Sequence, residues 1–110
     1  MRVYPLVVTD GDGRALGIIA IAPNEGFVQL YRIGAFVQGR GDGASMMTIL
    51  CAAADRFGAE IRVQVEPEFL GTQREIPDEK LREWYRRFGF VGGRYMTRRP
   101  VKSEAPTPKA

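Results

Sequence analysis

The chain has 110 residues, of which 45% are hydrophobic and 26% are charged, and its formal net charge is +3. This length and composition are typical of one ordinary globular domain with a modest core. A single cysteine and the lack of histidine exclude an internal disulfide and disfavour a zinc site, so we expect no metal. Because no apolar run approaches the about 20 residues of a membrane span, and no signal peptide pattern is present, we expect a cytoplasmic protein with no membrane partner.

The first half of the chain predicts three antiparallel strands, at Val3–Val8, Arg14–Ala22 and Phe27–Val37. Two short turns connect them, one with two Asp-Gly steps and one that begins at a proline. In the third strand, Val28 and Leu30 fall on one phase of the alternation, whereas Ile33, Ala35 and Val37 fall on the other. A β-bulge between Tyr31 and Gly34 would restore one buried face, and glycine is a common marker of a bulge.

A helix is predicted over Ala44–Phe57, with Gly58 in the position that ends it. Its expected buried stripe consists of Met47, Leu50, Cys51, Ala54 and Phe57, widened by Met46, Ile49 and Ala53.

The rest of the chain predicts a strand over 61–65, a loop over 68–76, a helix from Pro77 to Phe88 and a last strand over 90–98. Helical spacing puts Leu81, Trp84, Tyr85 and Phe88 on the core. The order β-β-β-α-β-α-β indicates the α/β class, a mixed α+β sheet with helices on its faces. We expect one domain over 1–98 and a proline-containing tail over 99–110.

The glycine-rich segment Gln38–Gly43 carries the strongest functional signal. It has three glycines within five residues and leads into a helix N-terminus, where unpaired N–H groups favour an anion such as a pyrophosphate. Arg40 adds a positive charge beside it, and Ser45 adds a hydroxyl. The segment lacks the Gly-Lys-Ser/Thr of a P-loop and the spacing of the dinucleotide fingerprint, and glycine clusters can also simply form turns.

Three segments in order resemble the GNAT N-acetyltransferase superfamily. Gln38-Gly39-Arg40-Gly41-Asp42-Gly43 matches its Gln/Arg-x-x-Gly-x-Gly/Ala signature, Tyr85-Arg86-Arg87-Phe88-Gly89-Phe90 resembles its Tyr-x-x-x-Gly-Phe segment, and Met96-Thr97-Arg98 resembles a closing Met-x-Arg. The resemblance covers 27–98 and implies a GNAT-like acyl-CoA N-acyltransferase fold, in a short form without the usual N-terminal strand and helices.

The resemblance also implies acetyl-CoA as the co-substrate and assigns residues to it. The expected CoA contacts are Phe36 and Val37 with pantetheine, and Gln38, Gly39, Arg40, Gly41, Gly43, Ala44 and Ser45 with the pyrophosphate.

For catalysis, the resemblance implies that Tyr85 is the acid that protonates the leaving thiolate, although the same tyrosine lies on the core face of its helix. Glu66 is the best-placed base, with Glu25 and Glu68 as fallbacks and a water chain as another route; each glutamate can equally be an ordinary surface residue. Many relatives carry a glutamate on the third strand, where this chain has Gln29 and Tyr31. Cys51 has no histidine to activate it, which disfavours an acyl-cysteine.

Three functions therefore compete. The first is N-acetyl transfer to an amine-bearing small molecule or a protein amino group, by a homodimer whose partner subunit completes the acceptor site. The second is a catalytically inactive CoA-binding or scaffolding domain, favoured by the missing glutamate. The third, and weakest, is nucleic-acid binding through the basic C-terminal part, whose cluster can also serve a phosphorylated cofactor or be a solvated face. That cluster comprises Arg82, Arg86, Arg87, Arg94, Arg98, Arg99 and Lys102.

Overall fold

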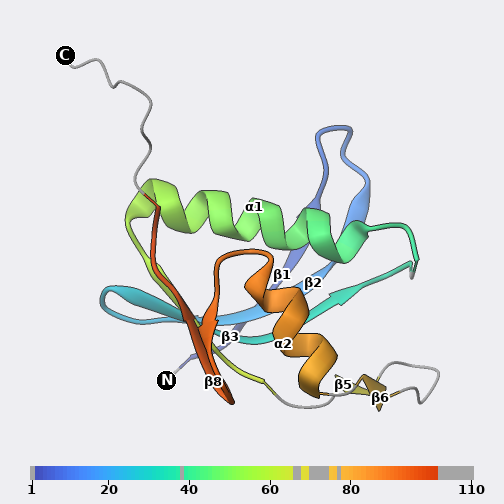
Figure 1. The fold of residues 1–110 in the computed structure, drawn as a ribbon. Helices are drawn as coiled ribbons and strands as arrows, with labels where there is room; N and C mark the ends of the chain where they lie inside the picture. The colour runs from blue at the N-terminus through green and yellow to red at the C-terminus, as the bar shows by residue number, and fades with distance from the viewer. Residues whose placement is uncertain (1, 38, 66–67, 70–74, 77, 102–110) are drawn as a thin grey trace.

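The computed structural model of the chain contains a six-stranded sheet with strand order β1-β2-β3-β4-β8-β7 (Figure 1). Its strands are β1 (Tyr4–Thr9), β2 (Ala15–Pro23), β3 (Phe27–Ala35), β4 (Glu60–Gln64), β7 (Val91–Gly92) and β8 (Tyr95–Arg98). The structure describes residues 2–37, 39–65, 68–69, 75–76 and 78–101. β3 and β4 are parallel and the other neighbours are antiparallel, which confirms the mixed sheet and its opening meander.

The predicted bulge is present in β3, where the pairing with β2 gains one residue at Tyr31. Ala20 pairs with Arg32, whereas the next residue of β2 pairs with Leu30. The prediction is therefore confirmed at the first position of its range. Gly34 keeps regular pairing, so the glycine that suggested the bulge is not its location. The inserted residue lets both apolar phases of β3 join one core cluster.

Helix α1 (Asp42–Phe57) begins two residues earlier than predicted, after Gly41, and ends at Gly58 in the left-handed conformation, with φ of 67°. Four apolar residues of the helix are buried: Met46, Met47, Cys51 and Ala54.

The expected burial of Ile49 and Phe57 is wrong, because their exposed fractions are 42% and 80%. Ile49 follows Met47 by two positions and so lies about 200° around the helix from it. Phe57 is the last helical residue, where Gly58 turns the chain away.

Helix α2 (Asp78–Arg86) is shorter than predicted and directs Leu81 and Tyr85 into the core, with Trp84 and Phe88 partly buried against it. The segment expected to be a loop over 68–76 contains two paired strands, β5 (Glu68–Phe69) and β6 (Glu75–Ile76). The single strand expected over 90–98 is instead the hairpin of β7 and β8. Gly92 has φ of 130° there, and a Cβ would collide with the Tyr95 carbonyl, so the chain turns at this glycine.

Arg98 ties the last strand to α1 and to the turn that follows α2. Its guanidinium nitrogens donate to the two carboxylate oxygens of Asp55 on α1 at 2.8 and 3.1 Å, and its Nε donates to the Phe88 carbonyl at 2.7 Å. The Asp55 carboxylate also accepts the Val101 N–H at 2.9 Å. The hydrogen bond from Arg98 is the main reason why the pKa of Asp55 is lowered. Nearby Cys51 is buried, which raises the pKa of its thiol.

Both helices lie on the same face of the sheet (Figure 1). A single core cluster joins Met46 and Cys51 of α1, Tyr85 of α2 and the strand residues that face them. On the opposite face, Val7 and Ile18 pair side by side and are 60% and 37% exposed. In the described part of the chain no helix covers that face, so both helices expected against the sheet lie on the other one.

Candidate functional site

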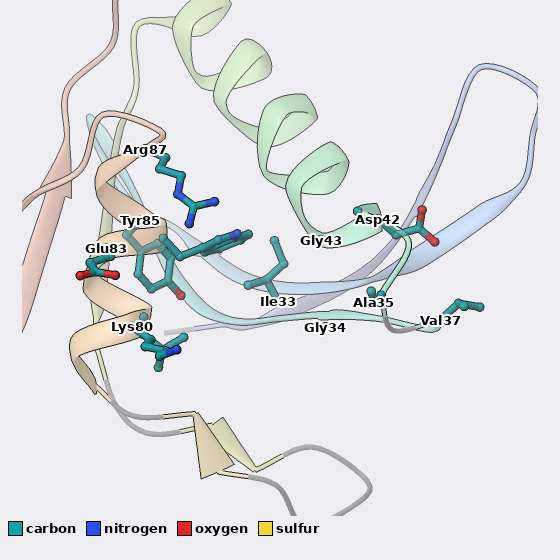
Figure 2. A pocket seen from close by; sticks show the side chains of 14 residues that line it. Ile33, Gly34, Ala35, Val37, Asp42, Gly43, Lys80, Glu83, Tyr85 and Arg87 are labelled. Carbon is teal, nitrogen blue, oxygen red and sulfur yellow. The ribbon is translucent and has the colours of Figure 1, made fainter.

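A cavity of about 420 Å³ lies between the second half of β3, the glycine-rich loop and helix α2 (Figure 2). Its walls are Ile33, Gly34, Ala35 and Val37 on the β3 side, Gly39, Gly41, Asp42 and Gly43 at the loop, and Lys80, Leu81, Glu83, Trp84, Tyr85 and Arg87 on the α2 side.

The cavity exists because β3 and β4 part. Their parallel pairing ends at Leu30 and Val63, whereas β3 continues to Ala35. The bulge at Tyr31 follows directly after the last paired residue and increases the local twist of β3. The end of β3 therefore forms a cavity wall instead of a continued parallel ladder.

The glycine-rich loop lines the cavity with glycines, which present backbone and no side chain. Gly39 and Gly41 have φ of 79° and 80°, a conformation that disfavours any residue with a Cβ. A Cβ at either position would meet no atom within 4 Å, so the backbone conformation, not crowding, requires glycine. Gly41 is the N-cap of α1 and makes no side-chain cap hydrogen bond. The first turn of α1 thus keeps the N–H groups and the positive dipole end that attract an anion.

An acidic side chain also stands at this helix end. Asp42, the first residue of α1, is only 5% exposed and accepts hydrogen bonds from both terminal nitrogens of Arg14, at 3.2 and 3.3 Å. Arg14 also pairs with Asp10 at 3.3 Å. The hydrogen bond to Asp42 is the main reason why the pKa of Arg14 is raised. The carboxylate of Asp42 is therefore held by a cation from the turn just before β2.

Two cations, Lys80 on α2 and Arg87 just after its end, also line the cavity. In Figure 2 the Arg87 side chain reaches toward the cavity from the end of the helix. From the sequence, Arg87 was expected only as part of the basic cluster, and no role was expected for Lys80. Together with Trp84 they follow i, i+4, i+7 spacing, which is the signal that could have found them.

Tyr85 is both a core residue and a cavity residue. It is 5% exposed, and its ring packs against Trp84 and Phe90 at centroid distances of 5.3 and 5.2 Å. It also lines the cavity, into which Figure 2 shows its ring pointing from α2. Both interpretations of Tyr85 made from the sequence are therefore compatible with its position.

The other assigned residues divide into those at the cavity and those elsewhere. Val37, Gly39, Gly41 and Gly43 line it. The residues assigned to CoA that do not line it are Phe36, Arg40, Ala44 and Ser45.

Of these, Ala44 and Ser45 lie instead in a shallow surface depression beside Arg14 and Thr48. Phe36 and Arg40 are exposed. Gln38 and Glu66 lie outside the described residues, as does most of the expected tail. Glu25 is exposed in the turn between β2 and β3, away from the cavity.

No protein-family model and no curated protein sequence matches the chain. Several solved structures, however, have a similar fold. The anti-CRISPR protein AcrVA5 superposes with a TM-score of 0.65 at 19% identity, covering 88% of this chain and 98% of that one. An acyl-CoA N-acyltransferase from Pseudomonas aeruginosa gives a TM-score of 0.59 at 19% identity, over 89% of this chain and 69% of that one.

A third similar structure is a PaiA N-acetyltransferase from Thermoplasma acidophilum in complex with coenzyme A. It superposes with a TM-score of 0.57 at 14% identity, over 90% of this chain and 62% of that one. At these identities the likeness concerns the fold, and several of the similar structures are acyltransferases of one superfamily. The chain has the fold of the GNAT acyl-CoA N-acyltransferases.

Proposed function

We propose that the chain binds acetyl-CoA in the cavity and transfers the acetyl group to an amine. The observation that carries this proposal is the meeting of the glycine-rich loop and Tyr85 in one cavity. The loop would hold the pyrophosphate through backbone N–H groups and the dipole of α1. Lys80 and Arg87, which line the same cavity, would add positive charge toward the phosphates.

The pantetheine arm would lie along the end of β3, where the parallel partner strand has ended. Val37 and Ala35 line the cavity there and would contact it. An extended arm with amide groups suits this end of β3, beyond the residues that pair with β4, since a strand backbone can donate and accept hydrogen bonds. This placement brings the thioester toward α2 and Tyr85.

In the reaction, the neutral amine would attack the thioester carbonyl carbon. A C–N bond forms, the C–S bond breaks, and the sulfur leaves as a thiolate. The Tyr85 hydroxyl would give its proton to that sulfur, and the amine would lose a proton to a base. Glu66 remains our proposed base, with a water chain as the alternative. We also propose a homodimer in the cytoplasm, in which the partner subunit helps to enclose the amine.

Calorimetric titration with acetyl-CoA and CoA tests the binding step. We expect micromolar binding, followed by release of free thiol when a panel of amines and lysine peptides is supplied. Lack of binding to either ligand would refute the proposal. Light scattering on the same sample tests the dimer.

A second candidate function is CoA binding without turnover. It is supported by Gln29 and Tyr31, which stand on β3 where a glutamate base would be expected from the resemblance. Tight CoA binding with no thiol release from any amine would favour this alternative.

A further inference from the structure

The short turn between β1 and β2 is connected to the glycine-rich loop by one arginine. Asp10 accepts the backbone N–H groups of Asp12 and Arg14 at 2.9 Å each, which fixes the turn. Arg14 leaves this turn and reaches Asp42 with both terminal nitrogens, across 28 positions of sequence. The contact therefore joins a turn with no role in the proposed reaction to the first residue of α1.

Asp42 is in an unfavourable place for a pyrophosphate site. It lines the cavity, and its carboxylate is buried at the helix end that would attract the anion. An unbalanced carboxylate there would repel a doubly charged pyrophosphate and would occupy the positive end of the helix dipole itself. In Figure 2 the Asp42 side chain points away from Tyr85, toward the outer side of the loop.

On the basis of the proposed function, we propose that Arg14 is a positioning residue for CoA. It holds the Asp42 carboxylate on the outer side of the glycine-rich loop and offsets its charge. The inner side of the loop can then accept the pyrophosphate. Arg14 does not line the cavity and would not contact the ligand. Its two parallel hydrogen bonds fix the carboxylate in direction as well as in charge.

An ordinary structural role predicts something different. If Asp42 only stabilised the N-terminus of α1, and Arg14 only fastened the turn, removing either one would weaken folding and affect CoA only through folding. Under our proposal, loss of Arg14 weakens CoA binding because the negative charge of Asp42 is no longer offset. Removing that charge as well must then restore CoA affinity, although the ion pair is still absent.

The experiment compares the full chain with Arg14→Ala, Asp42→Asn and the double variant, by CoA titration at low and high salt, with thermal unfolding as a check. We expect Arg14→Ala to weaken CoA binding roughly fivefold to tenfold relative to the wild type at the same salt concentration, and salt should reduce this loss only a little because the Asp42 carboxylate is buried. Asp42→Asn should bind CoA at least as tightly as the wild type, and the double variant should return to within about twofold of it.

Three results would overturn the inference. One is a double variant as weak as Arg14→Ala, and another is wild-type affinity in Arg14→Ala; both would leave the proposed function intact if the wild type binds CoA. The third is a wild-type chain that does not bind CoA, which would overturn the proposed function together with this inference. The supporting result is rescue by Asp42→Asn without recovery of the unfolding temperature.

Discussion

Replacing Arg98 by methionine gives the sharpest test of what holds the fold together. Arg98 is buried, at 7% exposure, and it makes three hydrogen bonds to two other segments. Methionine keeps much of the volume of the arginine stem but leaves the Asp55 carboxylate and the Phe88 carbonyl without that partner. The loss thus combines a broken ion pair with a carbonyl that loses its donor.

The size of the effect follows from burial. Breaking a fully buried pair costs about 3–5 kcal/mol. The Asp55 side chain is 26% exposed and keeps its bond from Val101, so water can solvate part of it. We therefore expect about 2–3 kcal/mol, which for a domain of this size lowers the unfolding temperature by about 10–20 °C.

The loss of stability in Arg98→Met should also depend on pH. Because Arg98 lowers the pKa of Asp55 in the folded state, this pair stabilises the protein fully above the pKa of an unfolded aspartate, about 3.9. Its contribution is lost as the pH falls through the lower folded pKa. The difference in stability between wild type and Arg98→Met should therefore shrink as the pH falls below the pKa of aspartate in the unfolded chain.

Urea unfolding followed by circular dichroism at neutral and acidic pH would measure both effects. Arg99→Met is the matched control, because Arg99 is the exposed neighbour of Arg98 and should change stability by less than about 0.5 kcal/mol. A loss in Arg98→Met no larger than that of the control, or a loss that does not diminish in acid, would refute the reasoning.

Three further predictions concern the loop, the tyrosine and the sheet. Gly41→Val forces a branched residue to φ of 80° and should weaken CoA binding about tenfold or more in a titration; unchanged affinity would contradict the role of the loop. Tyr85→Phe keeps the ring packing and should leave CoA affinity intact while slowing thiol release about 10²-fold or more, and an unaltered rate would remove Tyr85 from catalysis. Gly17→Ala would drive a Cβ into the Gly34 carbonyl oxygen, a backbone atom that cannot move aside as a side chain can, and should destabilise by about 1–3 kcal/mol in urea, whereas Gly34→Ala meets no atom within 4 Å and is the control.

The sequence predicted the parts of the fold that depend on local pattern. The phase change in β3 located the bulge because a strand has a period of two, and a glycine located the end of α1 because only glycine easily adopts the left-handed conformation. The glycine loop was found through its three glycines before a helix N-terminus and Tyr85 through the family resemblance, and both line the cavity.

What the sequence missed depends on long-range contacts. Nothing in the local pattern relates Arg14 to Asp42 or Asp55 to Arg98, since these pairs are 28 and 43 positions apart. The burial of Phe57 was predicted wrongly because an apolar stripe does not reveal that its last residue, just before the turn at Gly58, lies beyond the core. The hairpin of β7 and β8 was missed because a glycine pair inside an apolar segment can bend a strand or turn it back.

The parting of β3 and β4 has a consequence for the protein in the cell. Beyond Leu30 and Val63 these two strands are no longer paired, so a ligand that lies along the end of β3 would make hydrogen bonds in place of those with β4. Such a ligand binds only the folded chain and adds its binding energy to folding, by about 2.7 kcal/mol at a hundredfold excess over its dissociation constant. Under the proposed function, the abundance of the folded protein would therefore rise and fall with the supply of CoA.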